Sequence, residues 1–290
     1  MLYRKKEEPK LSEELFQNPT SEYRGTPFWA WNCKVTEEQI DFQTEALKEM
    51  GMGGAHIHCR TGMNIPYMSE EFLDRVAYAH EKLKEKQMLT WLYDEDRWPS
   101  GYGGGYVTKD SRYRMRFLVF SPEEIPEGVP EKRGRDISAA VIVRSEKRTL
   151  LKRYAVCLNE NGTMDDYQVL EKGDICPEGY DPWYAYLEIS GDNVWFNNQA
   201  YVNTLDPEAI SCFLKVTHEK YAEKLGNDFG KGIPAIFTDE PQFAHKTRLE
   251  YAHDRKVQFL PYTDDFEETY QKAYGETFLN GLPEILCERS

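Results

Sequence analysis

The sequence predicts an α/β chain of the (β/α)₈-barrel type, incomplete and containing the first four strands, with an inserted all-β subdomain. Strand and helix patterns alternate through the first hundred residues, which is typical of parallel strands joined by right-handed crossovers. Between about 117 and 195 this alternation gives way to short β-like runs separated by turn residues. In addition, each of the four expected parallel strands ends in a group of polar side chains.

The first expected strand is GTPFWAWN (25–32), a short aromatic run bounded by turn residues. Thr36 and Gln39 then fit a capping box, which predicts a helix that starts behind Thr36 and ends near Gly51. Its expected inner stripe consists of Ile40, Gln43, Leu47 and Met50.

The second expected strand is GGAHIHCR (53–60), followed by a helix over about 70–86 and a third strand that begins at 88. The helix buries Phe72, Val76, Ala79 and Leu83. A third helical pattern starts at Asp206 as N-cap and runs to Gly226 as C-cap. The fourth strand follows at 233–238, and a further helix covers about 264–274. The expected inner stripe of the 206–226 helix is Ile210, Leu214, Thr217, Tyr221 and Leu225.

These elements divide the chain into three parts. Residues 1–116 form the first part of the barrel with three βα units, and 117–200 form the β-rich insertion. Residues 201–290 continue the barrel with the fourth strand and its flanking helices. The β-like runs of the insertion are RFLVF, AAVIVR, RYAVCL and WYAYLEI.

Composition and charge limit the classes of partner. The formal net charge is −14, so we expect repulsion from nucleic-acid phosphates and from anionic membranes. The short basic clusters, such as 132–135 and 112–116, are mixed with acidic residues. No apolar run reaches the ~18 residues of a membrane span, the first residues lack the apolar core of a signal peptide, and six scattered cysteines favour reduced thiols. We therefore expect a soluble cytoplasmic protein.

The polar strand ends predict one shared site. In a parallel α/β barrel, the carboxyl ends of all strands open onto the face that holds the active site. Residues at these ends that we expect to bind substrate are Trp29, Trp31, Asn32, His56, His58, Arg60, Tyr93, Asp94, Asp96, Trp98 and Asp239. For the tryptophan pair we expect one ring in the core and one facing the site.

This set of side chains suits a carbohydrate. Aromatic rings stack on sugar rings, and carboxylates, amides, histidine and arginine hydrogen-bond hydroxyl groups. Glycoside hydrolysis needs two carboxyl groups, one of which is a protonated acid with a raised pKa. Glu240 is the candidate acid, because it follows a buried strand and precedes Pro241, which should bias it toward an extended backbone.

Other interpretations remain open at this stage. Asp94, Glu95 and Asp96 could hold hydroxyls or a cation, or form a loop cluster neutralised by Arg97. The glycine-rich stretch 101–105 permits unusual backbone angles but lacks the ending of a phosphate-binding loop. His56 and His58 lie two apart on a strand, an arrangement with which a metal-dependent amidohydrolase supplies two ligands. We expect no metal here, and substrate hydrogen bonding or burial for these histidines instead.

With these residues placed, the chain resembles a known group of enzymes. The stretches RGTPFWAWN, MGMGGAHIHCRTGM, WLYDEDRWPSGYGGG, WFNNQAYVNTLDPEA and IPAIFTDEPQF are similar to the catalytic barrel of α-L-rhamnosidase-like glycoside hydrolases related to family 106. The resemblance covers nearly all 290 residues. In the wider group of barrel glycosidases the acid/base glutamate ends the fourth strand, often after Asn; here that position is Glu240, with Asp239 in place of the Asn.

The resemblance also implies what else the site needs. It implies no cofactor apart from room for a calcium ion, and a carbohydrate substrate. The partner carboxylate would come from a later strand, because a (β/α)₈ barrel needs eight. We therefore expect the N-terminal part of a longer enzyme, or a chain that a second chain completes. The alternative functions are a non-catalytic carbohydrate-binding or partner-dependent fragment and the amidohydrolase that uses His56 and His58.

Overall fold

The computed structural model describes residues 10, 12–126, 128 and 140–290, and these divide into two compact units. Unit 1 contains the chain up to Val107 together with Ile210–Pro241, and unit 2 contains Thr108–Ala209 together with Gln242–Ser290. The basic cluster at 132–135 and the first residue of the run at 139–144 lie outside the described residues.

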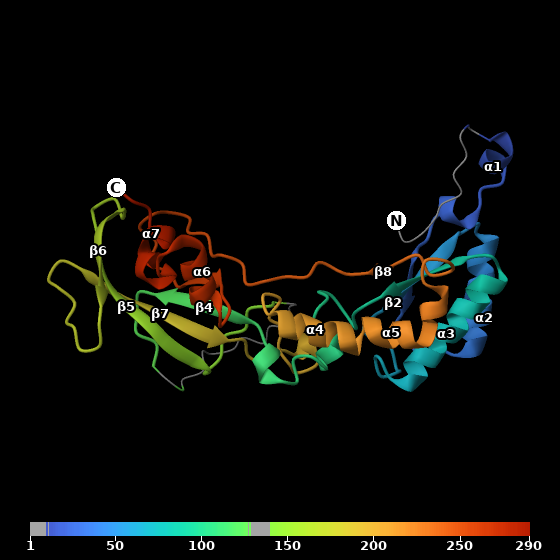
Figure 1. Ribbon diagram of the computed structural model, residues 1–290, viewed down its shortest axis with the longest axis horizontal. Helices are drawn as coiled ribbons and strands as arrows, with labels where there is room; N and C mark the ends of the chain where they lie inside the picture. Colours follow the sequence, from blue (N-terminus) through green and yellow to red (C-terminus); the bar gives the residue numbers. More distant parts are fainter. Residues whose placement is uncertain (1–9, 11, 127, 129–139) are drawn as a thin grey trace. The chain divides into compact units, whose positions relative to one another are not determined.

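Unit 1 is built on a four-stranded parallel sheet. Its strands run in the order β1-β2-β3-β8, with Trp31 opposite Cys59, His56 opposite Trp91, and Tyr93 opposite Phe237. Figure 1 shows α2, α3 and α5 beside this sheet. The elements of unit 1 are α1 Glu13–Gln17, β1 Phe28–Trp31, α2 Glu37–Glu49, β2 Gly54–Cys59, α3 Glu70–Glu85, β3 Leu89–Tyr93, α5 His218–Leu225 and β8 Ile236–Phe237.

Local sequence signals predicted helices α2 and α3 well. Thr36 and Gln39 form the expected capping box at the start of α2. The expected inner face of α3 is buried at all four positions. In α2 the stripe differs at its end, because Met50 is exposed and Thr44 is buried instead.

The fourth strand is shorter than expected. The carbonyls of Gly232, Ala235 and Phe237 accept hydrogen bonds from the backbone N–H groups of β3 and of the residue after it. Only Ile236–Phe237 form a strand. Pro234 has no N–H group, so it interrupts the ladder within the expected run 233–238.

The long helix expected over 206–226 is two helices. α4 covers Pro207–Val216 and contains the boundary between the units, and α5 starts at His218. Thr217 separates them with a non-helical backbone (φ −123°, ψ −77°), and its hydroxyl donates to the carbonyl of Phe213 at 2.7 Å. Such back-bonding bends helices. Most of the expected inner stripe is buried: Thr217, Tyr221 and Leu225 are buried, whereas Leu214 is exposed.

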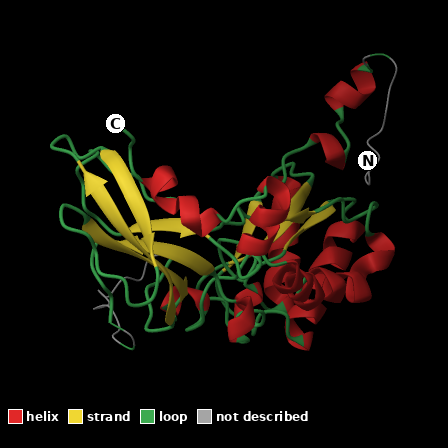
Figure 2. Cartoon of the chain, turned by 60° about the vertical axis from the view of Figure 1, so that its left-hand side comes forward, coloured by secondary structure: helices red, strands yellow, loops and turns green. Residues whose placement is uncertain are grey.

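Unit 2 contains a five-stranded antiparallel sheet in the order β6-β5-β7-β4-β9 (Figure 2). The β-rich segment was predicted, but its bounds were not. Unit 2 starts at Thr108, and residues 242–290, which we expected to continue the barrel, supply β9 and two helices to it. The run at 140–144 forms no strand. The elements of unit 2 are β4 Arg116–Ser121, β5 Arg148–Leu158, β6 Met164–Leu170, β7 Asp181–Ile189, β9 Gln258–Pro261, α6 Phe266–Tyr274 and α7 Leu282–Leu286.

The core of unit 2 explains why the C-terminal segment belongs there. Trp183 stacks on Phe120 across β7 and β4, at 4.7 Å between ring centroids. The same cluster includes Leu260 of β9 and Leu282 and Leu286 of α7. The hydroxyl of Tyr154 donates to the carbonyl of Leu279, which fastens the C-terminal segment to β5.

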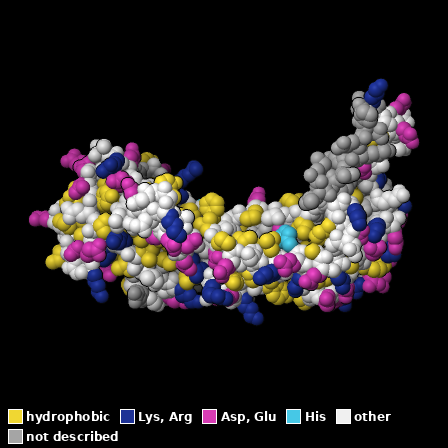
Figure 3. Space-filling model, viewed as in Figure 1, with side chains coloured by type: hydrophobic (Ala, Val, Ile, Leu, Met, Phe, Trp, Pro, Cys, Tyr) yellow, Lys and Arg dark blue, Asp and Glu magenta, His cyan; other side chains and the backbone are white. Residues whose placement is uncertain are grey.

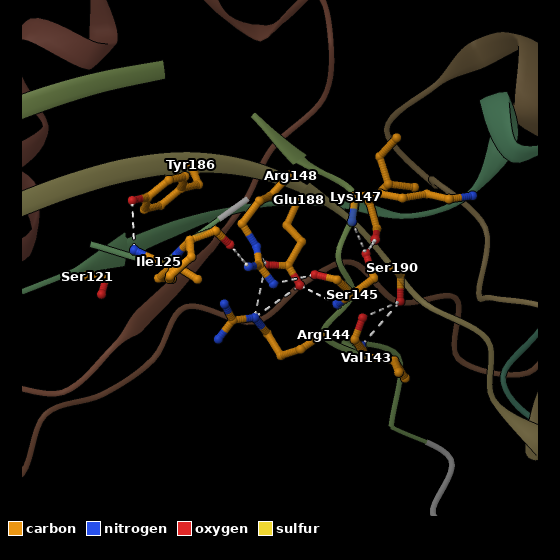
Figure 4. A network of polar contacts seen from close by, with 12 residues as sticks. Ser121, Ile125, Val143, Arg144, Ser145, Lys147, Arg148, Tyr186, Glu188 and Ser190 are labelled. Atoms are coloured by element: carbon orange, nitrogen blue, oxygen red, sulfur yellow. Dashed lines mark hydrogen bonds and ion pairs between the residues drawn. The ribbon is translucent and has the colours of Figure 1, made fainter. Parts of the chain in front are cut away.

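A buried ion-pair network closes the other face of the unit 2 sheet (Figure 4). The carboxylate of Glu188 on β7 accepts from the Nε of Arg144 at 3.0 Å, from the Nε of Arg148 at 3.4 Å, and from the backbone N–H of Ser145. Arg148 also donates to the carbonyl of Pro126 at 3.0 Å. The network therefore joins β7 to the segments around 126 and 145.

The surface agrees with the acidic composition. Figure 3 shows one face, on which basic and acidic side chains intermingle. Among the described residues, no helix has both the length and the apolar character that crossing a bilayer requires.

We expect the substitution Glu188→Gln to destabilise unit 2 by about 3–5 kcal/mol, because it leaves two buried guanidinium groups without their counter-charge. Glu188 and Arg148 side chains are fully buried, and that of Arg144 is 12% exposed. Hydrogen exchange of β7 amides measures the change. The matched control is Glu171→Gln, which removes an exposed pair with Lys152 and should cost less than about 1 kcal/mol. Equal effects of the two substitutions would contradict the role of the network.

Candidate functional site

The two faces of the parallel sheet differ in what covers them. Trp29 and Trp31 are buried in the core of unit 1, where Trp31 packs edge-on against Phe72 of α3 and the indole N–H of Trp29 donates to Gln43 of α2. We expected one of these rings to face a substrate; instead strand alternation turns both toward the helices. Asn32, the next predicted site residue, is exposed at the end of β1.

The opposite face of the sheet carries a cluster of aromatic rings. His56 stacks on Trp91 with an interplanar angle of 4°, and His58 stacks on Tyr93 with centroids 3.9 Å apart. Phe28 lies edge-on to both histidines and is 54% exposed. The predicted site residues His56, His58 and Tyr93 therefore share one face.

His58 is held as a neutral imidazole. Its Nδ1 lies 3.1 Å from the carbonyl of Cys59, so Nδ1 carries the proton and Nε2 is left as an acceptor. Burial, with a smaller contribution from the charge of Arg60, lowers the pKa of His58 to about 4, and the hydrogen bond to Cys59 opposes this. The imidazole is therefore uncharged at neutral pH. It is only 1% exposed, so it supports the aromatic cluster and does not meet a substrate as we expected.

Two carboxylates lie at the carboxyl end of β8, as the sequence predicted. Asp239 accepts a hydrogen bond from the hydroxyl of Tyr93 at 3.3 Å, and Glu240 accepts one from the indole N–H of Trp98 at 2.9 Å. Burial raises the pKa of Asp239, the negative charge of Glu240 adds to this rise, and Tyr93 and Arg60 oppose it. Five predicted site residues are thus brought together: Arg60, Tyr93, Trp98, Asp239 and Glu240.

The backbone at Glu240 differs from the expectation. Its φ is +43°, in the left-handed region, whereas Pro241 was expected to favour an extended conformation. A non-glycine residue in this region is strained, and such strain persists only where the surroundings impose it. Glu240 is exposed, and its hydrogen bond to Trp98 is one constraint on its position.

Asp94 has a different role from the one predicted. It is fully buried and points to the helix side, where it accepts from the hydroxyls of Ser100 and Thr238, both at 2.6 Å. Its Oδ2 also lies 3.5 Å from Nε2 of His218. Burial raises the pKa of Asp94 and lowers that of His218. Sequence reasoning missed His218, because nothing local to it marks a residue that meets another 124 positions earlier.

Glu95 shapes the glycine-rich loop instead of facing a ligand. Its two carboxylate oxygens accept from the backbone N–H groups of Asp96, Gly101, Gly103 and Gly104, at 2.6–3.0 Å. Three of these donors are glycines with positive φ, so the expected unusual backbone angles are present. At Gly104 an added Cβ would lie 2.7 Å from the ring of Tyr67, which explains the need for glycine there.

Asp96 is nearly buried and paired. The guanidinium of Arg97 donates to it at 2.9–3.0 Å, as the loop-cluster interpretation predicted. Asp94, Glu95 and Asp96 therefore stabilise the loop after β3. The side chains that remain available to a ligand belong to residues before and after these three.

Among the described residues, His80, Glu81 and Asp228 are the three side chains close enough together to hold a metal ion, and His56 and His58 are not part of this group. In that group Asp228 already accepts from His80 and from Lys84, each at 3.1 Å. The ammonium group of Lys84 thus occupies the position next to Asp228 that a metal ion would take.

Comparison with known proteins gives a likeness of fold. No family model matches the sequence, and no curated protein matches it. The chain is similar in structure to a rhamnosidase from Novosphingobium sp. PP1Y, with a TM-score of 0.55 and 13% sequence identity. The match covers 96% of this chain and 43% of that one. The fold is therefore rhamnosidase-like, a mixed α/β arrangement with a parallel sheet and a separate antiparallel sheet.

We expect the substitution Glu95→Gln to loosen the loop at 96–104. The amide nitrogen would face backbone N–H groups that now donate to a carboxylate oxygen, and each buried donor left unpaired costs about 1–3 kcal/mol. Urea unfolding at pH 9, where Glu95 is ionised although burial raises its pKa to about 8, measures the loss, with the exposed Glu81→Gln on α3 as control.

The pH dependence of this loss tests the charge state. Burial raises the pKa of Glu95 from 4.5 to about 8, although the four N–H groups oppose the rise. The folded chain then binds the Glu95 proton more tightly than the unfolded chain does, so wild-type stability falls relative to the Gln variant as the pH rises from 4.5 to 8. A rise in wild-type stability relative to the Gln variant over that interval would show that the four N–H groups lower the pKa of Glu95 more than burial raises it.

Proposed function

We propose that unit 1 carries part of a glycosidase site for α-L-rhamnosides, in which Glu240 is the general acid. The observation that carries this proposal is the pair of carboxylates at the end of β8, where Glu240 is exposed and tethered by Trp98. The rhamnosidase-like fold supports the substrate class. The position also agrees with the general rule that parallel α/β sheets bind ligands at the carboxyl ends of their strands.

Each neighbouring side chain has a chemical task in this proposal. Glu240 protonates the departing glycosidic oxygen, and Trp98 holds its carboxyl group through the other oxygen. Asp239 and Arg60 hydrogen-bond sugar hydroxyls. A second carboxylate that activates water or attacks the sugar would come from a strand beyond the four described here.

In the complete enzyme, the substitution Glu240→Gln should lower turnover in a way that depends on the leaving group. A sugar or alcohol leaving group needs protonation, so we expect a loss of about 10²–10⁴-fold on such rhamnosides. A nitrophenol leaves as a stable anion, so its rhamnoside should lose much less. Release of rhamnose from the two substrates measures the difference.

Glu223→Gln is the matched control, because Glu223 is an exposed glutamate on α5 in the same unit. It should leave both rates unchanged. Equal losses on the two substrates in the Glu240 variant would remove the general-acid role from this residue.

A partner-dependent site is the second candidate, and a specific observation favours it. β1 and β8 each pair on one side within the sheet, and the ring of Phe28 on the face away from the helices is 54% exposed. Open sheet edges and an exposed aromatic face invite further strands. We propose that such strands, from a second chain or from additional residues, complete a barrel and supply the missing carboxylate.

For this second candidate we expect the 290-residue chain alone to bind methyl α-L-rhamnoside without hydrolysing it. Half of a catalytic pair can hold a sugar, but both carboxyl groups are needed for turnover. Calorimetric titration detects the binding, and a reducing-sugar assay detects hydrolysis. Hydrolysis by the isolated chain would contradict partner dependence.

A further inference from the structure

Unit 2 contains a hollow that is lined by none of the residues of the proposed glycosidase site. It has a volume of about 880 Å³, within the usual range for ligand pockets. Its walls come from the segment 243–252, from the first residue of β9, and from the end of α7 with Glu288. We call it the 243–252 groove.

The walls of the groove are held in place by hydrogen bonds. The backbone N–H of Thr247 donates to the carbonyl of Phe259 at 3.0 Å, and the N–H of Phe259 donates back to the Thr247 hydroxyl at 2.9 Å. On the other side, the ammonium of Lys246 donates to the carbonyl of Ile285 at 3.1 Å. The segment is thereby fastened to both β9 and α7.

Gln258 gives the groove an unsatisfied polar group. The residue lines the groove and is only 2% exposed, and its Nε2 is buried with no hydrogen-bond partner among the described residues. Buried donors in folded proteins are nearly always paired with protein, water or ligand. A water or a ligand that enters the groove can supply the acceptor for Gln258.

The remaining walls indicate the chemistry of that ligand. Phe243 and Tyr251 are 50% and 57% exposed, so they offer flat apolar faces. The charges of Lys246 and Arg248 are matched by those of Glu250 and Glu288, which disfavours a strongly anionic or cationic ligand. A neutral molecule with apolar C–H faces and many hydroxyl groups fits all three features, because a hydroxyl can accept from an amide N–H.

We propose that the 243–252 groove binds a short oligosaccharide, by stacking on Phe243 and Tyr251 and by a hydrogen bond to Gln258. It is a binding site without catalytic groups of its own, and it would hold a sugar chain independently of the carboxylates of unit 1. The use of a rhamnose probe below rests on the proposed function, whereas the groove itself does not.

The test is a titration of the full chain, labelled with ¹⁵N, with a linear rhamno-tetrasaccharide. The side-chain amide signal of Gln258 is assigned by its loss in Gln258→Leu. We expect this signal to shift saturably in the wild type. We expect Tyr251→Ala, which removes a ring that is 57% exposed, to weaken the binding about tenfold through the lost ring contact.

Tyr274→Ala is the matched control, since Tyr274 is 70% exposed on α6 and does not line the groove. It should bind as the wild type does, and so should Glu240→Gln. Absence of a saturable Gln258 shift, or wild-type affinity in Tyr251→Ala, overturns the proposal.

The same titration separates this proposal from the proposed function. Shifts confined to amides of unit 1 would overturn the groove and leave the glycosidase proposal intact. A saturable Gln258 shift that survives in Glu240→Gln, from a chain that hydrolyses no rhamnoside under any condition, would support the groove although the glycosidase proposal had failed.

Discussion

The buried carboxylate of Asp94 is the contact on which the candidate site depends. It accepts from Ser100 in the loop after β3 and from Thr238 after β8, and Ser100 in turn accepts from the backbone N–H of Asp239 at 2.9 Å. β8 itself has two residues, so strand pairing alone fixes little of the chain behind it. The hydrogen bonds around Asp94 therefore set where Asp239 and Glu240 lie relative to Tyr93 and Trp98.

Strand alternation then decides which side chains can serve a ligand. Residues that follow one another on β3 separate into Tyr93, which stacks on His58, and Asp94, which meets His218 of α5. The same alternation places Trp29 and Trp31 among the helices and leaves Phe28 on the open face. A polar strand end therefore contributes about half of its residues to a site and the rest to the support beneath it.

The sequence predicted what depends on neighbouring residues and missed what depends on distant ones. The capping box of α2, the buried stripe of α3 and the first three parallel strands follow from local patterns, and the structure confirms them. β9 was missed, because its pairing with β4 joins residues more than 130 positions apart. Glu95 was expected to hold a hydroxyl or a cation, or to belong to a loop cluster neutralised by Arg97. Its actual role was missed, because it depends on four backbone N–H groups of a loop whose path could not be predicted. Among candidate site residues, the carboxylate pair after β8 was found at the expected strand end, and the burial of both tryptophans was not foreseen.

The interleaving of the two units has a consequence for how the chain can be made and divided. The last residue of unit 1 is Pro241. Unit 2 starts at Thr108 but also needs β9 and α7, which lie near the end of the chain. During synthesis on the ribosome, both cores would therefore stay open until the last quarter of the chain emerges. A shortened gene product that stops at residue 241 would lose Leu260, Leu282 and Leu286 from the interior of unit 2, so its antiparallel sheet would lack one side of its packing.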